Sequence, residues 1–280
     1  MLSYKHAFHS GNHADIIKHM TLCLLIRALN QKNKPYTLID THSGSGLYKL
    51  DGFMAQKNQE YKTGITKVLQ SDKLKQLVPE FFEVYDKVNL QVENSYPGSP
   101  MFESMLSREC DKLTLIDLHP NEFENLRNNF KKDRRCNVQC RDGLEALNAI
   151  LPPIIKRGLI LIDPAYEEKN EYFALVKAVK QALQKWNTAT IAIWYPVLAR
   201  QRDQSKKLTN DIRRLNYPLL QVELCIQEQE EEFGMCGSGM LILNYPYNLD
   251  EQLSDVVEEL YHLLGKKGAN ARLKVINAKE

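Results

Sequence analysis

The sequence predicts an α/β fold with a mostly parallel β-sheet that has helices on both faces. Short apolar runs rich in β-branched residues recur along the chain, and stretches of helical periodicity separate most of them. Four runs end at an aspartate or just before one. Because parallel strands present their carboxyl ends at one edge of the sheet, these aspartates are expected to gather around a ligand crevice there.

Seven runs are expected to be strands: 35–40, 113–118, 138–142, 158–163, 190–196, 219–226 and 240–245. Helical periodicity is clear at 121–131, 171–186 and 201–215. No full-length helix separates the last two runs. They could therefore form a hairpin, which would make one edge strand antiparallel.

Composition excludes some classes of protein. The 280 residues are 43% apolar, enough for one large domain or for one domain with an insertion. No signal peptide and no long apolar run is evident, so we expect neither secretion nor membrane spanning. The six cysteines are scattered without a CxxC pair, which argues against zinc or disulfide sites and favours the reducing cytoplasm. The chain is expected to be a monomer.

The distribution of charge is more informative than the net charge of +2. Basic residues cluster at 1–34, 127–141 and 200–214, whereas acidic residues gather elsewhere, notably at 228–232. Such segregation permits a basic face that follows phosphates. The alternative is that each cluster is a solvated helix surface.

The four strand-end aspartates are Asp40, Asp117, Asp142 and Asp163. Each would be costly to bury unpaired, so core packing explains them poorly. Any one of them could cap a helix. Together they favour a nucleoside-type ligand.

The loop after the first strand, 40–46, contains Gly44 and Gly46, which allow a tight turn and a close approach to a ligand. It lacks the full GxGxxG fingerprint, and the next strand-end acid, Asp117, comes far later than the roughly 20 residues expected of a dinucleotide fold. An insertion must lie between. We therefore expect a core formed by 1–50 and 96–280 and a small inserted helical subdomain at 51–95, whose apolar stripe belongs to the core.

The strongest local signal is a buried strand that runs into Asp163-Pro164-Ala165-Tyr166. An exocyclic adenine amine attacks poorly because its lone pair is delocalised into the ring. The Asp163 carboxylate and the Pro164 carbonyl could accept its two N–H bonds, and Tyr166 could stack on a base that has left its stack. Such a site suits methyl transfer from an activated donor and requires no metal. The alternative is an ordinary turn that closes a strand.

The N-terminal segment 4–19 holds four histidines. His9 and His13 have i, i+4 spacing, but no carboxylate or cysteine pattern supports a metal site. We favour a polar loop that leads into a helix from about Ala14. Lys18 and His19 would then face a cofactor or RNA.

Six segments resemble the bacterial 23S ribosomal RNA adenine-N6 methyltransferase J family: YKHAFHSGNHADIIKH, DTHSGSG, YPGSP, DGLEAL, GLILIDPAY and IAIWYP. The resemblance covers essentially the whole chain. It implies a Rossmann-like class I methyltransferase fold with a seven-stranded sheet and an inserted helical subdomain. It also implies S-adenosyl-L-methionine as cofactor, 23S rRNA as partner, and a role in rRNA processing through N6-methyladenosine.

The resemblance also implies site residues. Asp163 would be catalytic, together with Pro164 and Tyr166, and Tyr4 and His6 would contact the RNA. The residues expected at the cofactor are Lys18, His19, His42, Gly44, Ser99, Asp117, Asp142, Gly143 and Asp163. Two positions depart from the family pattern: Asp117 replaces a usual glutamate, and Ala165 replaces a second proline.

Three alternatives remain open at this point. A DNA adenine methyltransferase uses the same motif, and only a contact to the 2′-hydroxyl would separate the two. A non-catalytic ribosome-assembly factor on this fold is disfavoured by the retained Asp163 and glycine loop. A nicotinamide oxidoreductase is disfavoured by the incomplete glycine fingerprint.

Overall fold

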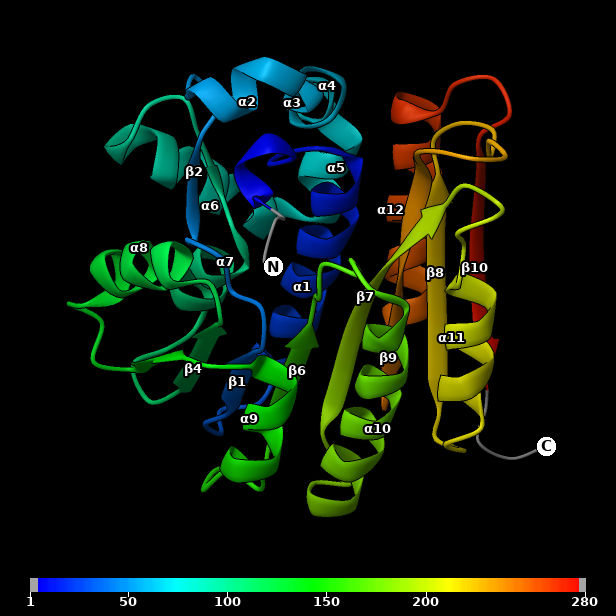
Figure 1. Cartoon of the computed structure of the whole chain (residues 1–280). Helices are drawn as coiled ribbons and strands as arrows, with labels where there is room; N and C mark the ends of the chain where they lie inside the picture. Colours follow the sequence, from blue (N-terminus) through cyan, green and yellow to red (C-terminus); the bar gives the residue numbers. More distant parts are fainter. Residues whose placement is uncertain (1–4, 277–280) are drawn as a thin grey trace.

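A computed structural model describes residues 5–276 of the chain (Figure 1). Its main sheet has eight strands: β1 (Thr37–Asp40), β4 (Lys112–Asp117), β5 (Cys136–Cys140), β6 (Gly158–Ile162), β7 (Thr190–Leu198), β8 (Leu219–Cys225), β9 (Met235–Leu243) and β10 (Asn270–Ile276). They lie in the order β10-β8-β9-β7-β6-β1-β4-β5. All pairings from β5 to β7 are parallel, which confirms the predicted mostly parallel sheet.

The antiparallel end of the sheet differs from the expectation. β9 pairs antiparallel with both β7 and β8, so the reversed strand of the hairpin lies inside the sheet and not at its edge. The edge is an eighth strand, β10, which pairs antiparallel with β8. The expected count of seven strands omitted it. The seven expected strands all occur.

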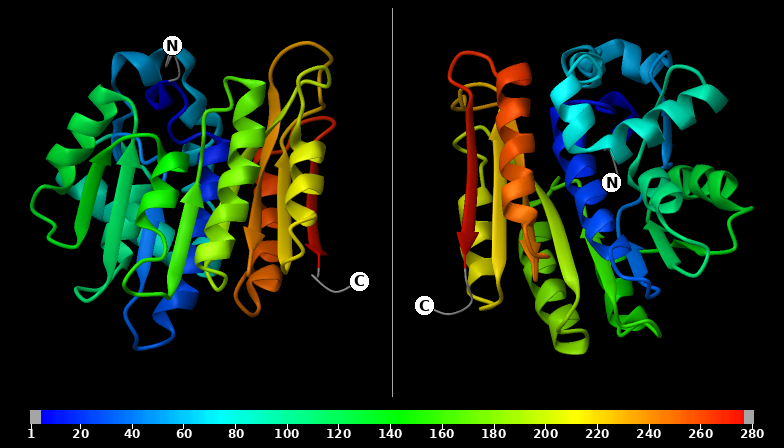
Figure 2. Two further views of the ribbon diagram at one scale, coloured as in Figure 1. Left: turned by 60° about the horizontal axis from the view of Figure 1, so that its bottom comes forward. Right: turned by 180° about the vertical axis from the view of Figure 1, so that it is seen from behind.

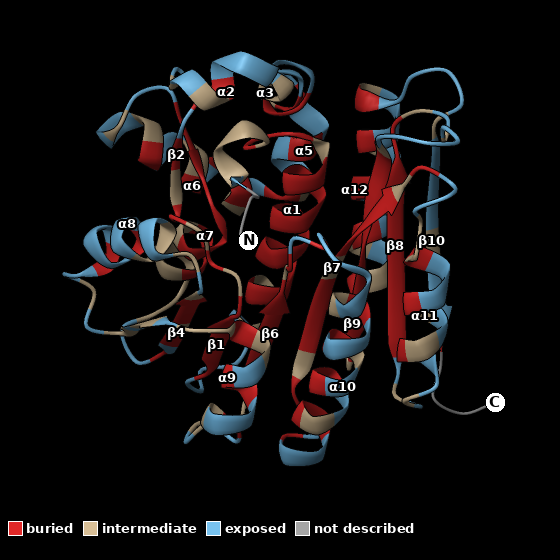
Figure 3. Cartoon of the chain, viewed as in Figure 1, coloured by how far each residue is buried: buried red, intermediate tan, exposed pale blue. Residues whose placement is uncertain are grey.

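Helices cover both faces of the sheet (Figure 2). One face carries α9 (Gly143–Ile150), α10 (Lys169–Lys185) and α11 (Ser205–Arg213), and the other carries α1 (His13–Asn30), α7 (Ser99–Leu106), α8 (Pro120–Phe130) and α12 (Leu249–Leu264). Strand residues alternate between the two layers, as Leu38 and Ile39 of β1 do. The central strands are therefore buried on both faces (Figure 3).

The segment predicted to be helical, 51–95, contains α2 (Phe53–Asn58), α3 (Glu60–Thr63), α4 (Ile65–Val68), α5 (Asp72–Leu77) and α6 (Pro79–Gln91). Two short strands, β2 (Leu47–Lys49) and β3 (Ser95–Pro97), pair where the segment leaves and rejoins the core. Its apolar stripe is buried, and Phe81 stacks on Phe102 of α7 with ring centroids 5.2 Å apart. These helices thus share a core with α1 and α7, and a separate subdomain stays a prediction.

No helix within residues 5–276 is long and apolar enough to cross a membrane.

Candidate active site

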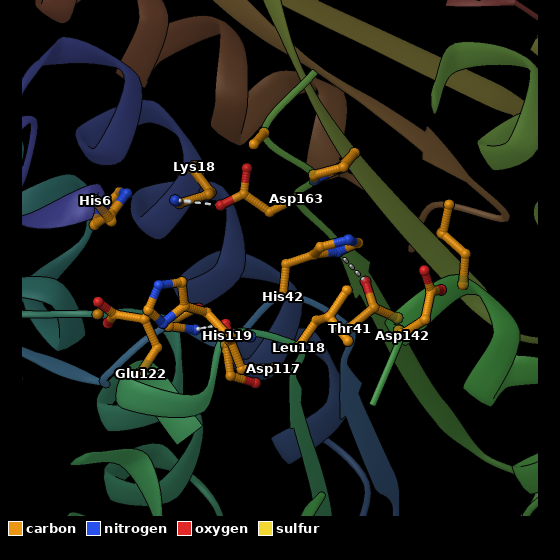
Figure 4. Close-up of a pocket in the computed structure, with 18 of the residues that line it drawn as sticks. His6, Lys18, Thr41, His42, Asp117, Leu118, His119, Glu122, Asp142 and Asp163 are labelled. Carbon is orange, nitrogen blue, oxygen red and sulfur yellow. Dashed lines mark hydrogen bonds and ion pairs between the residues drawn. The ribbon is translucent and has the colours of Figure 1, made fainter. Parts of the chain in front are cut away.

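A cavity of about 320 Å³ lies beyond the carboxyl ends of β1, β4 and β6 (Figure 4). Every residue expected at the cofactor lines it: Lys18, His19, His42, Gly44, Ser99, Asp117, Asp142, Gly143 and Asp163. Pro164 and His6 also reach it. The parallel strands bring these residues together from positions across half of the sequence. That each contacts a cofactor stays a prediction.

Asp40 lies beneath the cavity and does not line it. Its carboxyl group is fully buried, accepts the backbone N–H of His42 at 3.1 Å, and accepts the hydroxyl of Ser99 at 2.6 Å. Burial raises the pKa of Asp40 to about 7. Of the four strand-end aspartates, this one fixes the loop after β1 and the start of α7, which both face the ligand space.

Asp117 faces the cavity from the end of β4. Its two oxygens accept the backbone N–H groups of Gly44 and His119, each at 2.8 Å, and burial raises the pKa of the carboxyl group. Each carboxylate oxygen keeps a further acceptor site. The next residue, Leu118, is 44% exposed and lines the same cavity. An acceptor beside an exposed apolar side chain suits a ribose joined to a base.

Two glycines are required by close packing around the cavity. Gly44 has φ +59°, and a Cβ there would overlap the Tyr48 hydroxyl, which accepts the N–H of Ser45 at 3.0 Å. A Cβ on Gly143 would overlap the backbone carbonyl of Thr41. Asp142 caps α9 by accepting the N–H of Glu145 at 2.9 Å. The start of α9 is thereby held against the loop after β1.

Two histidines in the cavity wall are uncharged. Burial lowers the pKa of His42 to about 4, and the Thr41 hydroxyl lies 2.7 Å from its Nδ1 atom. Burial and the nearby Lys18 hold the pKa of His19 well below its ordinary value, and its Nδ1 atom pairs with the Tyr96 hydroxyl at 2.9 Å. Both rings therefore add polarity to the cavity without adding positive charge at neutral pH.

A second cavity, of about 310 Å³, lies on the other side of Asp163. The two cavities share six lining residues: His6, Lys18, Asp163, Pro164, Ala165 and Glu167. Trp194, Pro196 and Leu198 of β7 and Met235 of β9 form apolar walls of the second cavity. The sequence reasoning did not assign this wall. The only sign of this wall in the sequence was the IAIWYP segment at the end of a predicted strand.

An ionic chain joins the N-terminal segment to Asp163. The Lys18 ammonium group lies 2.6 Å from Asp163 and 3.0 Å from Asp15, and His6 lies 3.0 Å from Asp15. Lys18 and Asp15 are 4% and 2% exposed. Burial alone would raise the pKa of Asp15, but His6 and Lys18 hold it well below its ordinary value. Asp15 was not expected at the site.

Tyr166 differs in orientation from the expected open stacking face. It has φ +53°, is only 6% exposed, and packs against Tyr172 with ring centroids 4.4 Å apart. Its hydroxyl donates to the backbone carbonyl of Trp194 at 2.7 Å. The ring thus forms part of the wall of the second cavity, and its stacking on a base stays a prediction. Tyr4, expected at the RNA, lies outside the described residues.

Within residues 5–276, no group of three His, Cys, Asp or Glu side chains could hold a metal ion.

Comparison with known proteins identifies the family. The model of the family described as "Ribosomal RNA large subunit methyltransferase D, RlmJ" matches residues 33–276. Two proteins named "Ribosomal RNA large subunit methyltransferase J" are similar over nearly the whole chain. The protein of Escherichia coli K12 is 40% identical over 96% of each chain, and that of Haemophilus influenzae is 37% identical over 97% of each chain.

A solved structure agrees. The crystal structure of protein LPL1258 from Legionella pneumophila is 34% identical and superimposes with a TM-score of 0.86, covering 95% of this chain and 98% of that one. The strand order, with the reversed strand β9 next to β7 and helices on both faces of the sheet, is the Rossmann-like fold of class I methyltransferases. The resemblance drawn from the six sequence segments is confirmed, and the chain belongs to the family of ribosomal RNA large subunit methyltransferase J.

Proposed function

We propose that this chain transfers a methyl group from S-adenosyl-L-methionine to the N6 amine of one adenine in 23S ribosomal RNA. The observation that carries the proposal is that two cavities meet at Asp163 and Pro164. Transfer between two bound molecules needs both reacting atoms at one point. The family name supports ribosomal RNA of the large subunit as the substrate.

The first cavity fits the cofactor. Asp117 offers acceptors for two ribose hydroxyls, and Leu118 offers an exposed apolar surface for the adenine ring. Neutral His19 and His42 and the hydroxyl-bearing start of α7 at Ser99 suit the polar part of the molecule. The cofactor would supply an activated methyl group on a sulfonium.

The second cavity fits the target base. Its volume is that of a small-ligand pocket, and the side chains of Trp194, Pro196 and Met235 give it apolar walls for a planar ring. A base must leave its stack to enter such a pocket. The chain's own part in the reaction then takes place at the shared border of the two cavities.

At that border, the Asp163 carboxylate and the Pro164 carbonyl would accept the two N–H bonds of the amine. This draws the nitrogen lone pair out of conjugation with the ring and aims it at the donor. Lys18, fixed between Asp15 and Asp163, holds the carboxylate in place. The rate would come mainly from alignment and preorganised electrostatics. Asp163 would also be the acceptor within reach of the proton that the methylated amine must lose.

Methylation of defined RNA tests the proposal. Purified chain, the cofactor and 23S rRNA from cells that lack this gene would be combined, and the nucleosides analysed by mass spectrometry. One N6-methyladenosine per rRNA molecule is expected, with none for Asp163→Ala and none on DNA of the same sequence. No methylated adenine with the unaltered chain would refute the function, and methylation of the DNA alone would reassign it.

Location and assembly belong to the same proposal. A cytoplasmic protein would meet the rRNA directly, and all six cysteines are unpaired, which suits a reducing compartment. The chain is also proposed to act as a monomer.

A further inference from the structure

A third cavity, of about 350 Å³, is lined by residues of α11, β8 and the edge strand β10. These elements lie together at one end of the sheet (Figure 1). One side is a single face of α11, on which Lys206, Thr209 and Asn210 recur at helical spacing. The other side is β10, whose alternate residues Arg272 and Lys274 point to the same face. It is a polar groove that runs along β8.

The positive and negative groups of this groove are at different depths. Lys206, Arg272 and Lys274 are exposed at its rim, and the Arg272 side chain keeps 53% of its surface in solvent. Glu223 is buried in the floor, where it accepts the Tyr195 hydroxyl at 2.9 Å and lies 3.7 Å from the Arg272 guanidinium group. Asp203 accepts the Ser205 hydroxyl and N–H at the start of α11. A ligand therefore meets cations first, while the acids are already occupied.

The groove and the second cavity both reach the carboxyl end of β7. The two spaces lie on opposite faces of the sheet: Leu198 and Met235 border the second cavity, whereas Val197 and Cys236 point to the other face and border the groove. The exposed Arg202 stands at the rim of the second cavity, one residue before Asp203 of the groove. An RNA strand leaving the proposed base pocket would therefore pass around the end of β7, beside Arg202, to reach the groove and β10.

We propose that this groove binds the phosphate backbone of the RNA strand beside the target adenine. The inference rests on the proposed function, because it names where the flanking substrate lies. Lysine and arginine side chains along a groove neutralise successive phosphates of a nucleic acid and release their counterions, which makes binding dependent on salt. The basic cluster at 200–214 would then be a substrate surface, in part, and not only a solvated helix face.

The double variant Arg272→Gln/Lys274→Gln tests the inference. Each phosphate contact to a single strand contributes a salt slope of about 0.7, which corresponds to about fourfold in affinity at 0.15 M salt. The KM for rRNA should therefore rise by roughly tenfold to fifteenfold, and the slope of log KM against log salt should fall by about 1.4. The single-turnover rate at saturating RNA and the calorimetric Kd of the cofactor should not change.

The matched control is Lys34→Gln/Lys156→Gln, which removes two exposed cations at the opposite ends of the strands. It should behave as the unaltered chain. If the cations of β10 served only to prevent pairing with another strand, the groove variant would change neither the KM for rRNA nor its dependence on salt. Normal KM and normal salt slope in the groove variant, with methylation intact, would overturn this inference alone. Failure of the unaltered chain to methylate RNA would overturn the proposed function and the inference with it.

Discussion

The Asp163 carboxylate borders both cavities and lies 2.6 Å from its charge partner, the Lys18 ammonium group. An amide in its place keeps the size and one acceptor but loses the charge. We expect Asp163→Asn to lower the single-turnover methylation rate by roughly 10²-fold, the effect of losing one electrostatic contact to a transition state. The melting temperature should stay near that of the unaltered chain. A near-normal rate measured by rapid quench would contradict the assignment.

Asp40 gives the site a dependence on pH. Its pKa in the folded chain is about 7, against an ordinary value of 3.8, so the folded state binds a proton that the unfolded state has lost. The contribution of this group to the free energy of unfolding should therefore fall as pH rises from about 4 to about 7. Asp40→Asn removes that titration. Urea unfolding at several pH values should show the unaltered chain losing stability relative to the variant over this window, and parallel curves would contradict the shifted pKa.

The ionic chain at the site could not be predicted residue by residue. Burial of a lysine can be predicted only when its charge partners are known, and Lys18 and its partner Asp163 are 145 residues apart in the sequence. The strand-end acids were predictable because strand direction alone brings them to one edge. That rule also misplaced Asp40, which ends a strand but points beneath the loop and away from the cavity.

The element α9 depends on Gly143, since its first turn touches the backbone of the loop after β1. In Gly143→Ala the new Cβ would overlap the Thr41 carbonyl, which belongs to backbone and cannot rotate away. Overpacking of this kind typically costs about 1–3 kcal/mol. We expect the cofactor Kd, measured by calorimetry, to rise at least tenfold. Gly52→Ala is the control, because Gly52 has φ −69° and a Cβ there would come no closer than 3.1 Å to another atom. An equal loss of cofactor affinity in both variants would contradict the packing argument.

The loop after β6 carries the departure from the family pattern, Ala165. This residue is exposed, and its backbone N–H has no hydrogen-bond partner among residues 5–276. Ala165→Pro should therefore be tolerated and should raise the free energy of unfolding by about 0.4–1 kcal/mol, chiefly by restricting the unfolded chain. Methylation should be kept or modestly raised. A clear drop in both the melting temperature and the single-turnover rate would show that the loop has left the geometry that proline requires.

The elements that the sequence predicted are those with strong local signals. Buried parallel strands appear as continuous apolar runs, so β1, β4, β6 and β7 were found. β10 was missed because most of its residues are exposed and Arg272 and Lys274 interrupt its apolar pattern, as suits an edge strand. The first half of β9, Met235–Gly239, was missed because its glycines and serine look like a turn.

At the scale of the whole molecule, one sheet separates two apolar layers, and the insertion adds to only one of them. Side chains of α4, α5 and α6 form a continuous core with α1, α7 and β1. Trp186 lies in the opposite layer, and Trp194 contacts both layers. The site lies at the carboxyl ends of the central strands, where residues from both layers line it, so its geometry depends on both layers.

That arrangement makes the insertion part of the cooperative unit. Its ends are adjacent, since the Leu50 N–H donates to the Asn94 carbonyl at 2.7 Å, so residues 51–94 could be replaced by a short Gly-Ser linker without strain at the junction. Removing them would expose Phe102 and the buried face of α1, and we expect no cooperative unfolding transition in the shortened chain. In the full chain, urea transitions followed by tryptophan fluorescence and by far-ultraviolet circular dichroism should coincide, because both tryptophans lie outside the insertion whereas the dichroism includes its helices. A shortened chain that unfolds cooperatively, or two separated transitions in the full chain, would show instead that 51–95 is a subdomain with stability of its own.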